Sequence, residues 1–399
     1  MRILLDQAVY DQRNKGNVAL LQTAIDRFMK LWPDASIYVL TEAPYSLRLY
    51  CPTVHPVSVH PWNNWSQAHN RVETLLRMVP RPVLQFLLEL REDLWHRFPS
   101  LQSGEFRRRI KALLNPSPIN HVENSDADLV STMSIRKENQ NEEANQDFIQ
   151  ALQNADLVVA TGGGYLCDAD KQYSLQVFDT LEMAVNRGKP AGMVGIGVGP
   201  LHDQELRGRL GRFLPSLDLI LIREPKIAGP LLASLGVAPE RVIMTGDDAI
   251  EMAYEARPSG WGNFIGVNLR LARYTEVEQN HIEKVRLAIH QAAGRYRSTL
   301  MGLPTSYNIK EADLEVIRKI LKGYDKVSLN WRRFDSPSNM IKCIGRCRLV
   351  VTGSYHPAVF ALAQGIPAIG LVKSRAYIDK FSALQDEFGP ACQKINFED

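Results

Sequence analysis

Short apolar runs alternate with longer amphipathic stretches along most of this chain. Two apolar runs, residues 2–5 and 36–40, flank a helical pattern at 18–32. The alternation resumes at residue 157 and continues to residue 244. Repeated strand–loop–helix units of this kind are typical of a parallel sheet with helices on both faces. The first part of the chain is therefore predicted to form a Rossmann-like α/β domain, residues 1–257.

The pattern restarts after a linker rich in Gly and Pro at residues 257–262. Apolar runs at 264–269, 326–329 and 349–352 alternate with helical patterns, and the last helix is followed by another apolar run at 366–372. This predicts a second Rossmann-like domain, residues 263–399. Two such domains with parallel sheets facing across a cleft give a glycosyltransferase-B-like (GT-B-like) architecture.

Residues 52–150 lack clean strand periodicity and are predicted to be an insertion of helices and loops. Helical patterns cover 83–97 and 106–114, and 115–145 is a polar stretch that indicates a long loop or lid. The basic run Arg107–Lys111 fits a solvated helix face, and also a peripheral contact with a membrane surface or an anionic acceptor.

Composition narrows the class of protein. The hydrophobic content of 45% and charged content of 23% are ordinary for a globular protein, and the net charge of +3 gives no indication of nucleic acid binding. The start Met1–Asp6 reads as a strand and not as a signal peptide, and no run approaches a membrane span, so a cytoplasmic location is expected. Five scattered cysteines predict neither a disulfide framework nor a metal site, and the sequence does not indicate an oligomeric state.

Candidate chemistry gathers where strands end. His356 follows an apolar run and precedes a helical pattern that begins at Pro357, which is where open α/β sheets place ligands and where helices favour anions. Gly162, Gly163 and Gly164 follow the run at 157–160, and consecutive glycines let a backbone approach a ligand closely. These glycines match neither a P-loop nor a dinucleotide fingerprint.

Several short motifs occur in a characteristic order. They are Asn14-Lys-Gly-Asn17, Gly162-Gly-Gly164, Gly195-Ile-Gly-Val-Gly199, Arg223-Glu-Pro225, Thr245-Gly-Asp247, Gly266-Val-Asn-Leu-Arg270 and the strand–His356–helix–Gly-x-Pro block. In this order they resemble the polysaccharide pyruvyl transferase family over roughly 1–50 and 150–390.

The resemblance implies transfer of a pyruvyl group from phosphoenolpyruvate to two hydroxyls of a sugar, giving a pyruvate ketal and phosphate. The acceptor would be a glycan or glycan precursor, lipid-linked or not, as in exopolysaccharide synthesis, and no cofactor or metal is implied. One departure is clear: the family block often reads Arg-Leu-His, whereas this chain has Ser354-Tyr-His356.

The chemistry requires an acid, cations and a base. His356 is predicted as the general acid, because imidazole is the side chain most readily poised near neutral pH. The donor-binding candidates, which offer cations or hydroxyls for the donor's oxyanions, are Arg270, Ser354, Lys380, Arg332 and Arg333. Asp168 is the predicted base, chosen over Asp170, Asp247 and Asp248. The predicted acceptor or cleft residues are Asn14, Gly16, Asn17, Gly162, Gly163, Gly164 and Asp247.

Simpler interpretations stand beside these predictions. His356 and Asp247 also suit helix capping, and Arg223 and Glu224 suit an internal ion pair. For the whole chain, the alternatives are a nucleotide-sugar glycosyltransferase on the same architecture and a non-catalytic relative that binds a glycan or anion. The 354–372 block carries no acidic residue to contact a ribose, which disfavours the first alternative.

Overall fold

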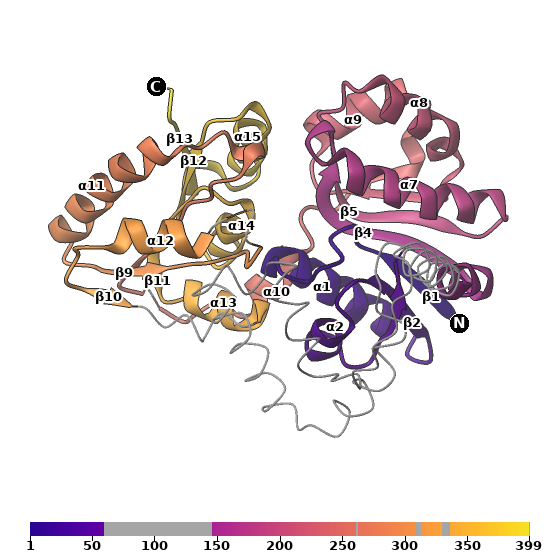
Figure 1. The fold of residues 1–399 in the computed structure, drawn as a ribbon, viewed down its shortest axis with the longest axis horizontal. Helices are drawn as coiled ribbons and strands as arrows, with labels where there is room; N and C mark the ends of the chain where they lie inside the picture. Colours follow the sequence, from indigo (N-terminus) through magenta and orange to yellow (C-terminus); the bar gives the residue numbers. More distant parts are fainter. Residues whose placement is uncertain (60–145, 261, 309–310, 312, 329–335, 399) are drawn as a thin grey trace, which may run out of the picture. The chain divides into compact units, whose positions relative to one another are not determined.

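The computed structural model describes residues 1–59, 146–260, 262–308, 311, 313–328 and 336–398. The predicted insertion helices, the 115–145 loop and the basic run Arg107–Lys111 lie outside these residues, as do Arg332 and Arg333. Residues Met1–Val57 and Ala151–Asp399 form one compact unit that contains two separate sheets, shown in Figure 1. No helix among the described residues is long and apolar enough to cross a membrane.

The first sheet has seven strands in the order β3-β2-β1-β4-β5-β6-β7. Strand β1 (Arg2–Asp6) lies inside the sheet and pairs in parallel with β2 (Ser36–Thr41) and with the central strand β4 (Leu157–Leu166). The strands further out are β3 (His55–Ser58) on one side and, on the other, β5 (Ala191–Val198), β6 (Leu219–Ile222) and β7 (Val242–Met244). The chain reverses its direction of winding between β1 and β4, which makes their carboxyl ends a topological switch point.

The second sheet has six strands in the order β10-β9-β8-β11-β12-β13, and all five pairs are parallel. Its strands are β8 (Phe264–Asn268), β9 (Thr299–Gly302), β10 (Val327–Ser328), β11 (Cys347–Thr352), β12 (Ala368–Val372) and β13 (Cys392–Asn396). Its switch point lies between β8 and β11. The predicted α/β class with two parallel sheets is confirmed.

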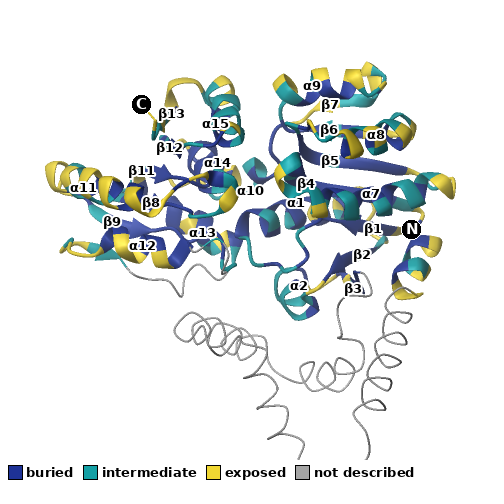
Figure 2. Ribbon diagram, turned by 45° about the horizontal axis from the view of Figure 1, so that its top comes forward, coloured by how far each residue is buried: buried dark blue, intermediate teal, exposed yellow. Residues whose placement is uncertain are grey.

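Figure 2 shows buried strands covered by helices that expose their outer faces, as the amphipathic patterns predicted. In the first half these helices are α1 (Lys15–Leu31), α2 (Pro44–Tyr50), α7 (Lys171–Asn186), α8 (Gln204–Phe213), α9 (Pro225–Ser234) and α10 (Ala249–Glu255). In the second half they are α11 (Gln279–Arg295), α12 (Asp313–Leu321), α13 (Pro337–Ile344), α14 (Tyr355–Ala363) and α15 (Arg375–Phe388).

One hydrophobic core joins elements from both halves of the sequence. It contains Ala19 and Leu20 of α1 and Ala249 and Ala253 of α10, together with most of α13 and α14. Helix α14 is apolar around most of its surface, and all residues from Pro357 to Ala363 are buried. A helix that is apolar on all sides is stable only inside a core, so α14 holds the loop before it firmly in place. The predicted domain boundary at 257–263 stays a prediction.

Two local predictions differ from the structure. Gly162, Gly163 and Gly164 lie inside strand β4 and not in a loop after it, because β4 continues its pairing with β5 beyond Thr161. The register shifts after Gly163, whose φ of 150° suits glycine. His356 lies in the first turn of α14 instead of before it.

Candidate functional site

A cavity of about 150 Å³ lies at the carboxyl ends of strands from both sheets. Its walls include the loop after β1, the end of β4, the residue after β8 and the turn from β11 into α14, which are the two switch points described above. The charged residues among its walls are Asp11, Asp170, Arg223, Arg270, Glu311 and Lys380. The remaining polar walls are Asn14, Asn17, Tyr165, Cys167, Tyr173, Tyr274, Thr305, Ser306, Asn308, Ser354, Tyr355, His356 and Tyr377.

His356 lines the cavity with its imidazole against the backbone of α1. A Cβ added to Gly16 would fall 2.1 Å from the Cγ and Nδ1 atoms of the ring, so only glycine fits there. The Nε2 atom is buried and has no hydrogen-bond partner among the described residues. Burial lowers the pKa of His356 to about 3, and the nearby cations Arg223, Arg270 and Lys380 act in the same direction. The imidazole is therefore neutral in the empty cavity.

Arg223 follows β6 and reaches the cavity from the first sheet. Its side chain is only 5% exposed, lies 3.4 Å from an oxygen of Asp247 and covers the ring of Tyr355 at 4.5 Å. Gly164 and Gly197 leave it room, because a Cβ at either position would come within 2.7 Å of the guanidinium. The sequence suggested an ion pair of Arg223 with Glu224, but Arg223 pairs with Asp247 instead and also faces the cavity. Glu224 accepts a hydrogen bond from the Ile227 N–H at the start of α9.

Lys380 of α15 reaches the same part of the cavity. Its Nζ atom lies 5.2 Å from the ring centre of Tyr377, and a Cβ at Gly164 would be 3.2 Å from it. Burial lowers the pKa of Lys380, and Cys167 and Asp170 oppose that shift. No ion pair to this ammonium group is found within the described part of the chain.

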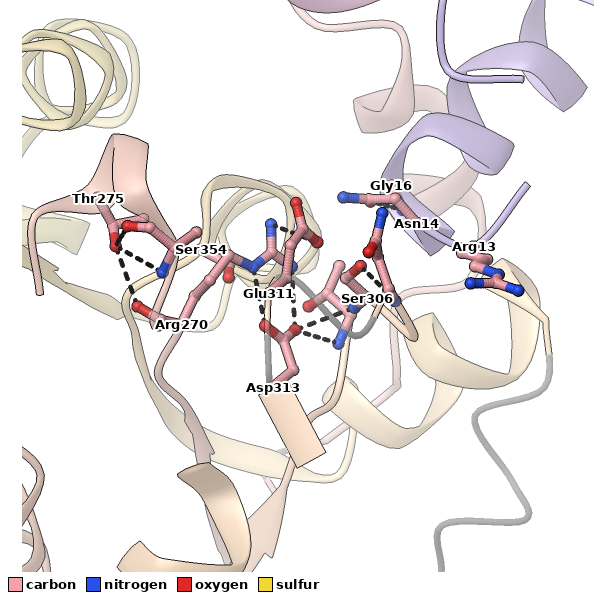
Figure 3. A network of polar contacts seen from close by, with 12 residues as sticks. Arg13, Asn14, Gly16, Arg270, Thr275, Ser306, Glu311, Asp313 and Ser354 are labelled. Carbon is pink, nitrogen blue, oxygen red and sulfur yellow. Dashed lines mark hydrogen bonds and ion pairs between the residues drawn. The ribbon is translucent and has the colours of Figure 1, made fainter. Parts of the chain in front are cut away.

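Arg270 follows β8 and is held by carboxylates, as Figure 3 shows. Its Nε and Nη2 atoms donate to the two oxygens of Asp313 at 2.8 and 2.9 Å. Asp313 also accepts from the Asn268 amide and from the backbone N–H groups of Thr305 and Ser306. The third guanidinium nitrogen, Nη1, lies 3.1 Å from the Tyr274 hydroxyl. All three guanidinium nitrogens of Arg270 are therefore engaged, and the side chain is a fixed positive wall of the cavity.

Two buried hydroxyls at the cavity lack hydrogen bonds. Ser354 and Thr305 are each 1% exposed, and their Oγ and Oγ1 atoms have no partner among the described residues. Burying a hydroxyl without a partner is costly. Since both residues line the cavity, these hydroxyls indicate that a polar ligand completes the site. Ser354 also precedes the free amides at the start of α14, which favour an anion.

The loop before α1 links the two halves of the site. Asn14 accepts a hydrogen bond from the Gly16 N–H at 3.0 Å and forms an antiparallel bridge with Ser306. On either side, the Lys15 N–H donates to the Thr305 carbonyl and the Tyr307 N–H donates to the Arg13 carbonyl. Asn14 and Asn17 line the cavity and Gly16 supports His356, so these three predicted cleft residues are brought together.

Asp168, the predicted base, is engaged elsewhere. Its two oxygens accept hydrogen bonds from the N–H groups of His202 and Asp203 at 2.8 and 3.0 Å, and it does not line the cavity. Asp170, two residues later, does line the cavity, and burial raises its pKa. The structure therefore offers Asp170 as the carboxylate at this wall.

The other predicted residues take supporting positions. Asp247 is buried, accepts from the Ala249 N–H at 2.9 Å and pairs with Arg223, so it holds a cavity residue without lining the cavity itself. Gly162 and Gly163 pack within β4, and only Gly164 reaches the wall. No group of three His, Cys, Asp or Glu residues among those described has a geometry suited to a metal ion.

Sequence reasoning missed Glu311, Asp313 and Tyr274. Glu311 and Asp313 follow β9, a strand that the apolar pattern did not single out, so nothing marked the loop after it as part of a switch-point site. Tyr274 lies in the segment after β8, where no sequence motif marked it. The paired acids of Glu311-Ala-Asp313 are the available signal. These acids can be assigned to the site only once Arg270 is known to lie beside them.

Comparison with known proteins places this geometry in a family. The model of the polysaccharide pyruvyl transferase family matches residues 14–374. No curated protein matches this chain.

Solved structures share the fold at low identity. A putative UDP-N-acetylglucosamine 2-epimerase from Listeria monocytogenes is 11% identical, with a TM-score of 0.50 over 96% of this chain and 81% of that one. A UDP-GlcNAc 2-epimerase from Methanocaldococcus jannaschii, solved with UDP-GlcNAc and UDP, is 13% identical, with a TM-score of 0.49 over 99% and 89%. MnaA from S. aureus, solved with UDP, is 14% identical, with a TM-score of 0.48 over 92% and 78%.

The predicted GT-B-like fold is thereby confirmed, and at these identities the likeness extends to the fold alone. The family match covers most of the chain and includes Asp170, Arg223, Arg270 and Glu311 of the cavity, whereas Asp11 and Lys380 lie outside the matched residues. The chain belongs to the polysaccharide pyruvyl transferase family, which supports a transferase that modifies a glycan.

Proposed function

We propose that this protein transfers the pyruvyl group of phosphoenolpyruvate to two hydroxyls of a sugar acceptor, forming a pyruvate ketal and releasing phosphate. The observation that carries this proposal is the set of three cations, Arg223, Arg270 and Lys380, around the unpartnered imidazole nitrogen of His356. Phosphoenolpyruvate is small and carries a phosphate and a carboxylate beside a carbon that must be protonated. Its chemistry matches this set of groups.

The donor's anionic groups bind at the cationic wall. Arg223 and Lys380 offer N–H donors to the phosphate, and the Ser354 hydroxyl and the amides at the start of α14 complete the phosphate site. Arg223 takes over the part of the arginine that the family block often carries at position 354. Arg223 stacks on Tyr355, which follows Ser354, and its guanidinium therefore lies near position 354 although Arg223 belongs to the first sheet.

Arg270 orients the donor more than it neutralises it. Asp313 and Tyr274 engage its three guanidinium nitrogens, so its positive charge attracts the donor carboxylate while the side chain stays fixed. A rigid arginine of this kind costs little conformational entropy when the ligand binds.

His356 becomes an acid only when the donor is present. In the empty cavity three cations and burial keep it neutral. The negative charges of bound phosphoenolpyruvate offset those cations and raise the pKa of His356, so the imidazole takes up a proton as the donor binds. It then protonates C3 of the donor while a hydroxyl oxygen of the acceptor bonds to C2.

Asp170 receives the proton of that hydroxyl. It lines the cavity beside Lys380, and its raised pKa makes it a stronger base than an exposed aspartate. The acceptor is a sugar with two neighbouring hydroxyls.

Calorimetric titration tests the donor directly. Phosphoenolpyruvate is expected to bind the full chain, and Arg223→Gln is expected to weaken binding at least tenfold. The matched control is Arg207→Gln, because Arg207 bonds Leu201 and Ser234 away from the cavity. Binding of UDP-sugars without binding of phosphoenolpyruvate would overturn the proposal and favour a nucleotide-sugar glycosyltransferase.

A further inference from the structure

Ketal formation has a requirement that Asp170 alone does not meet. Two acceptor hydroxyls bond to C2 of the donor, one after the other, and each must lose a proton. The two hydroxyls are different atoms of the sugar, so a carboxylate positioned against the first is not also positioned against the second. The reaction therefore needs a second base on the walls of the same cavity, a need that rests on the proposed function.

Glu311 lies on the wall formed by the second sheet. It precedes α12, whereas Asp170 belongs to the short turn after β4, so the two carboxylates reach the cavity from different sheets. Their charges nevertheless interact: burial raises the pKa of Asp170, and the negative charge of Glu311 raises it further. The two bases thus share one cavity.

Tyr274 and Arg270 hold the Glu311 carboxylate in place, and Figure 3 shows Arg270 beside Glu311. The Tyr274 hydroxyl donates to its Oε1 atom and itself accepts from Arg270 Nη1 at 3.1 Å. Burial raises the pKa of Tyr274, so its hydroxyl keeps its proton and remains a donor. Tyr274 in turn stacks on Tyr377, with ring centres 6.0 Å apart. This support fixes the carboxylate without occupying both of its oxygens.

The second oxygen of Glu311 is available. Oε2 is buried, lies 3.4 Å from Arg270 Nη1 and receives no hydrogen bond from the described residues. The buried, unpartnered hydroxyls of Ser354 and Thr305 line the same cavity. These orphaned atoms are independent signs that a polar ligand occupies this space. A sugar hydroxyl supplies the hydrogen bond that Oε2 lacks.

We propose that Glu311, held by Tyr274, is the base that accepts the proton of the second acceptor hydroxyl and so closes the ketal ring. In the first half of the reaction, His356 gives its proton to C3, the first hydroxyl oxygen bonds to C2, and its proton passes to Asp170. The bond from C2 to the phosphate oxygen then breaks. Phosphate leaves with the electron pair and takes the proton from Asp170.

The cation left at C2 is captured in the second half. The second hydroxyl oxygen bonds to C2, and its proton passes to Glu311. One donor and one diol have then become one ketal and one phosphate. Glu311 holds the proton that His356 has lost, and exchange with solvent resets both groups.

Glu311→Gln separates the two halves of the reaction. Without the second base, the cation at C2 returns a methyl proton to the now neutral His356 and leaves as a vinyl ether. Vinyl ether and ketal have the same mass, but proton NMR distinguishes two vinyl hydrogens from one methyl group. We expect Glu311→Gln to release phosphate and to shift at least half of the product to the vinyl ether. In D2O that vinyl group carries deuterium.

Three further variants complete the test. Tyr274→Phe, which loses the donated hydrogen bond and keeps the ring, is expected to give a smaller shift in the same direction. Asp170→Asn is expected to lower phosphate release at least a hundredfold. Glu315→Gln is the matched control, since Glu315 is exposed on α12 and pairs only with Lys319 in the described structure.

The outcomes separate the two proposals. Ketal as the sole product of both Glu311→Gln and Tyr274→Phe, at any rate, overturns the role of Glu311 while leaving the transferase intact. If the wild-type protein consumes no phosphoenolpyruvate with any diol, the proposed function fails, and the role of Glu311 fails with it. A vinyl ether from Glu311→Gln and ketal from Glu315→Gln support both proposals.

Discussion

His356 shows how surrounding charges can switch the role of a side chain. A histidine among three cations makes a poor acid, and the same histidine beside a bound trianion makes a good one. Binding of the ligand therefore helps to produce the protonated form of His356 that acts as the acid. This coupling links binding to pH in a direction that can be measured.

Phosphoenolpyruvate binding is expected to take up about one proton per molecule near neutral pH. The pKa of His356 is about 3 in the empty cavity, so the group is neutral above pH 4 and gains its proton only in the complex. Affinity should consequently fall as pH rises, by up to about tenfold per unit. Titration calorimetry in buffers of different ionisation enthalpy counts the protons.

The matched variant is His356→Gln, which keeps a polar side chain and cannot titrate. It should bind the donor with no proton uptake from this residue and lose at least a hundredfold in turnover. An unchanged proton count in His356→Gln would assign the uptake to another group, with Asp170 next in line.

Asp247 illustrates a residue that acts through another. It lies outside the cavity and pairs with Arg223. Asp247→Asn should raise the KM for phosphoenolpyruvate roughly tenfold, since a misplaced charge-assisted hydrogen bond costs about 1.5–3 kcal/mol. Steady-state kinetics across donor concentrations measures the effect. The same change at Asp218, which bonds the Ala191 N–H instead, should leave KM within about twofold.

At the scale of elements, helix α1 and helix α14 meet through a glycine. The imidazole of His356 occupies the space that a side chain at Gly16 would fill. The start of α1 thus fixes the position of the His356 ring, and the ring leaves room only for glycine at position 16.

Gly16→Ala is expected to reduce turnover at least tenfold and to destabilise the fold by about 1–3 kcal/mol, because overpacking forces the ring or the helix to move. Gly208→Ala is the control on helix α8, where nothing lies within 4 Å of the added carbon. That change should stabilise the protein by about 0.5–1 kcal/mol. Thermal unfolding and turnover are measured on both variants, and equal turnover in the two would argue against the close packing at Gly16.

The sequence predicted the elements better than it predicted the site. Apolar periodicity identified both sheets and placed His356 at the turn from β11 into α14, because such patterns are local. The sequence favoured Asp168 over Asp170 as the base, whereas Asp170 is the one that lines the cavity. The fine geometry of a turn decides which of two neighbouring acids faces a cavity, and a local sequence pattern does not contain that geometry. The contact of Arg270 with Asp313 joins residues 43 positions apart and has no local signature.

At the scale of the whole molecule, a continuous core joins the two sheets' helices. Phe360 of α14 is fully buried in the core that also holds residues of α1 and α10. The site depends on this core, since the cavity takes its walls from both sheets.

Phe360→Ala is therefore expected to lower the free energy of unfolding by about 3–5 kcal/mol. It should also increase amide hydrogen exchange in α1 as well as in α13, because both helices contact the same core. Leu287→Ala, an exposed position on α11, should change stability by less than about 0.5 kcal/mol. Loss of protection confined to α13 and α14 would show that the two halves unfold separately.

Phosphate release from phosphoenolpyruvate against a panel of glycosides, with the wild type beside His356→Gln, tests whether the cationic cavity uses this donor to modify a sugar diol. We expect release that depends on one acceptor, pyruvate retained on the sugar as a ketal, and loss of both in the variant. Acceptor-dependent release that continues unchanged in His356→Gln would show that this imidazole is not the acid of the reaction.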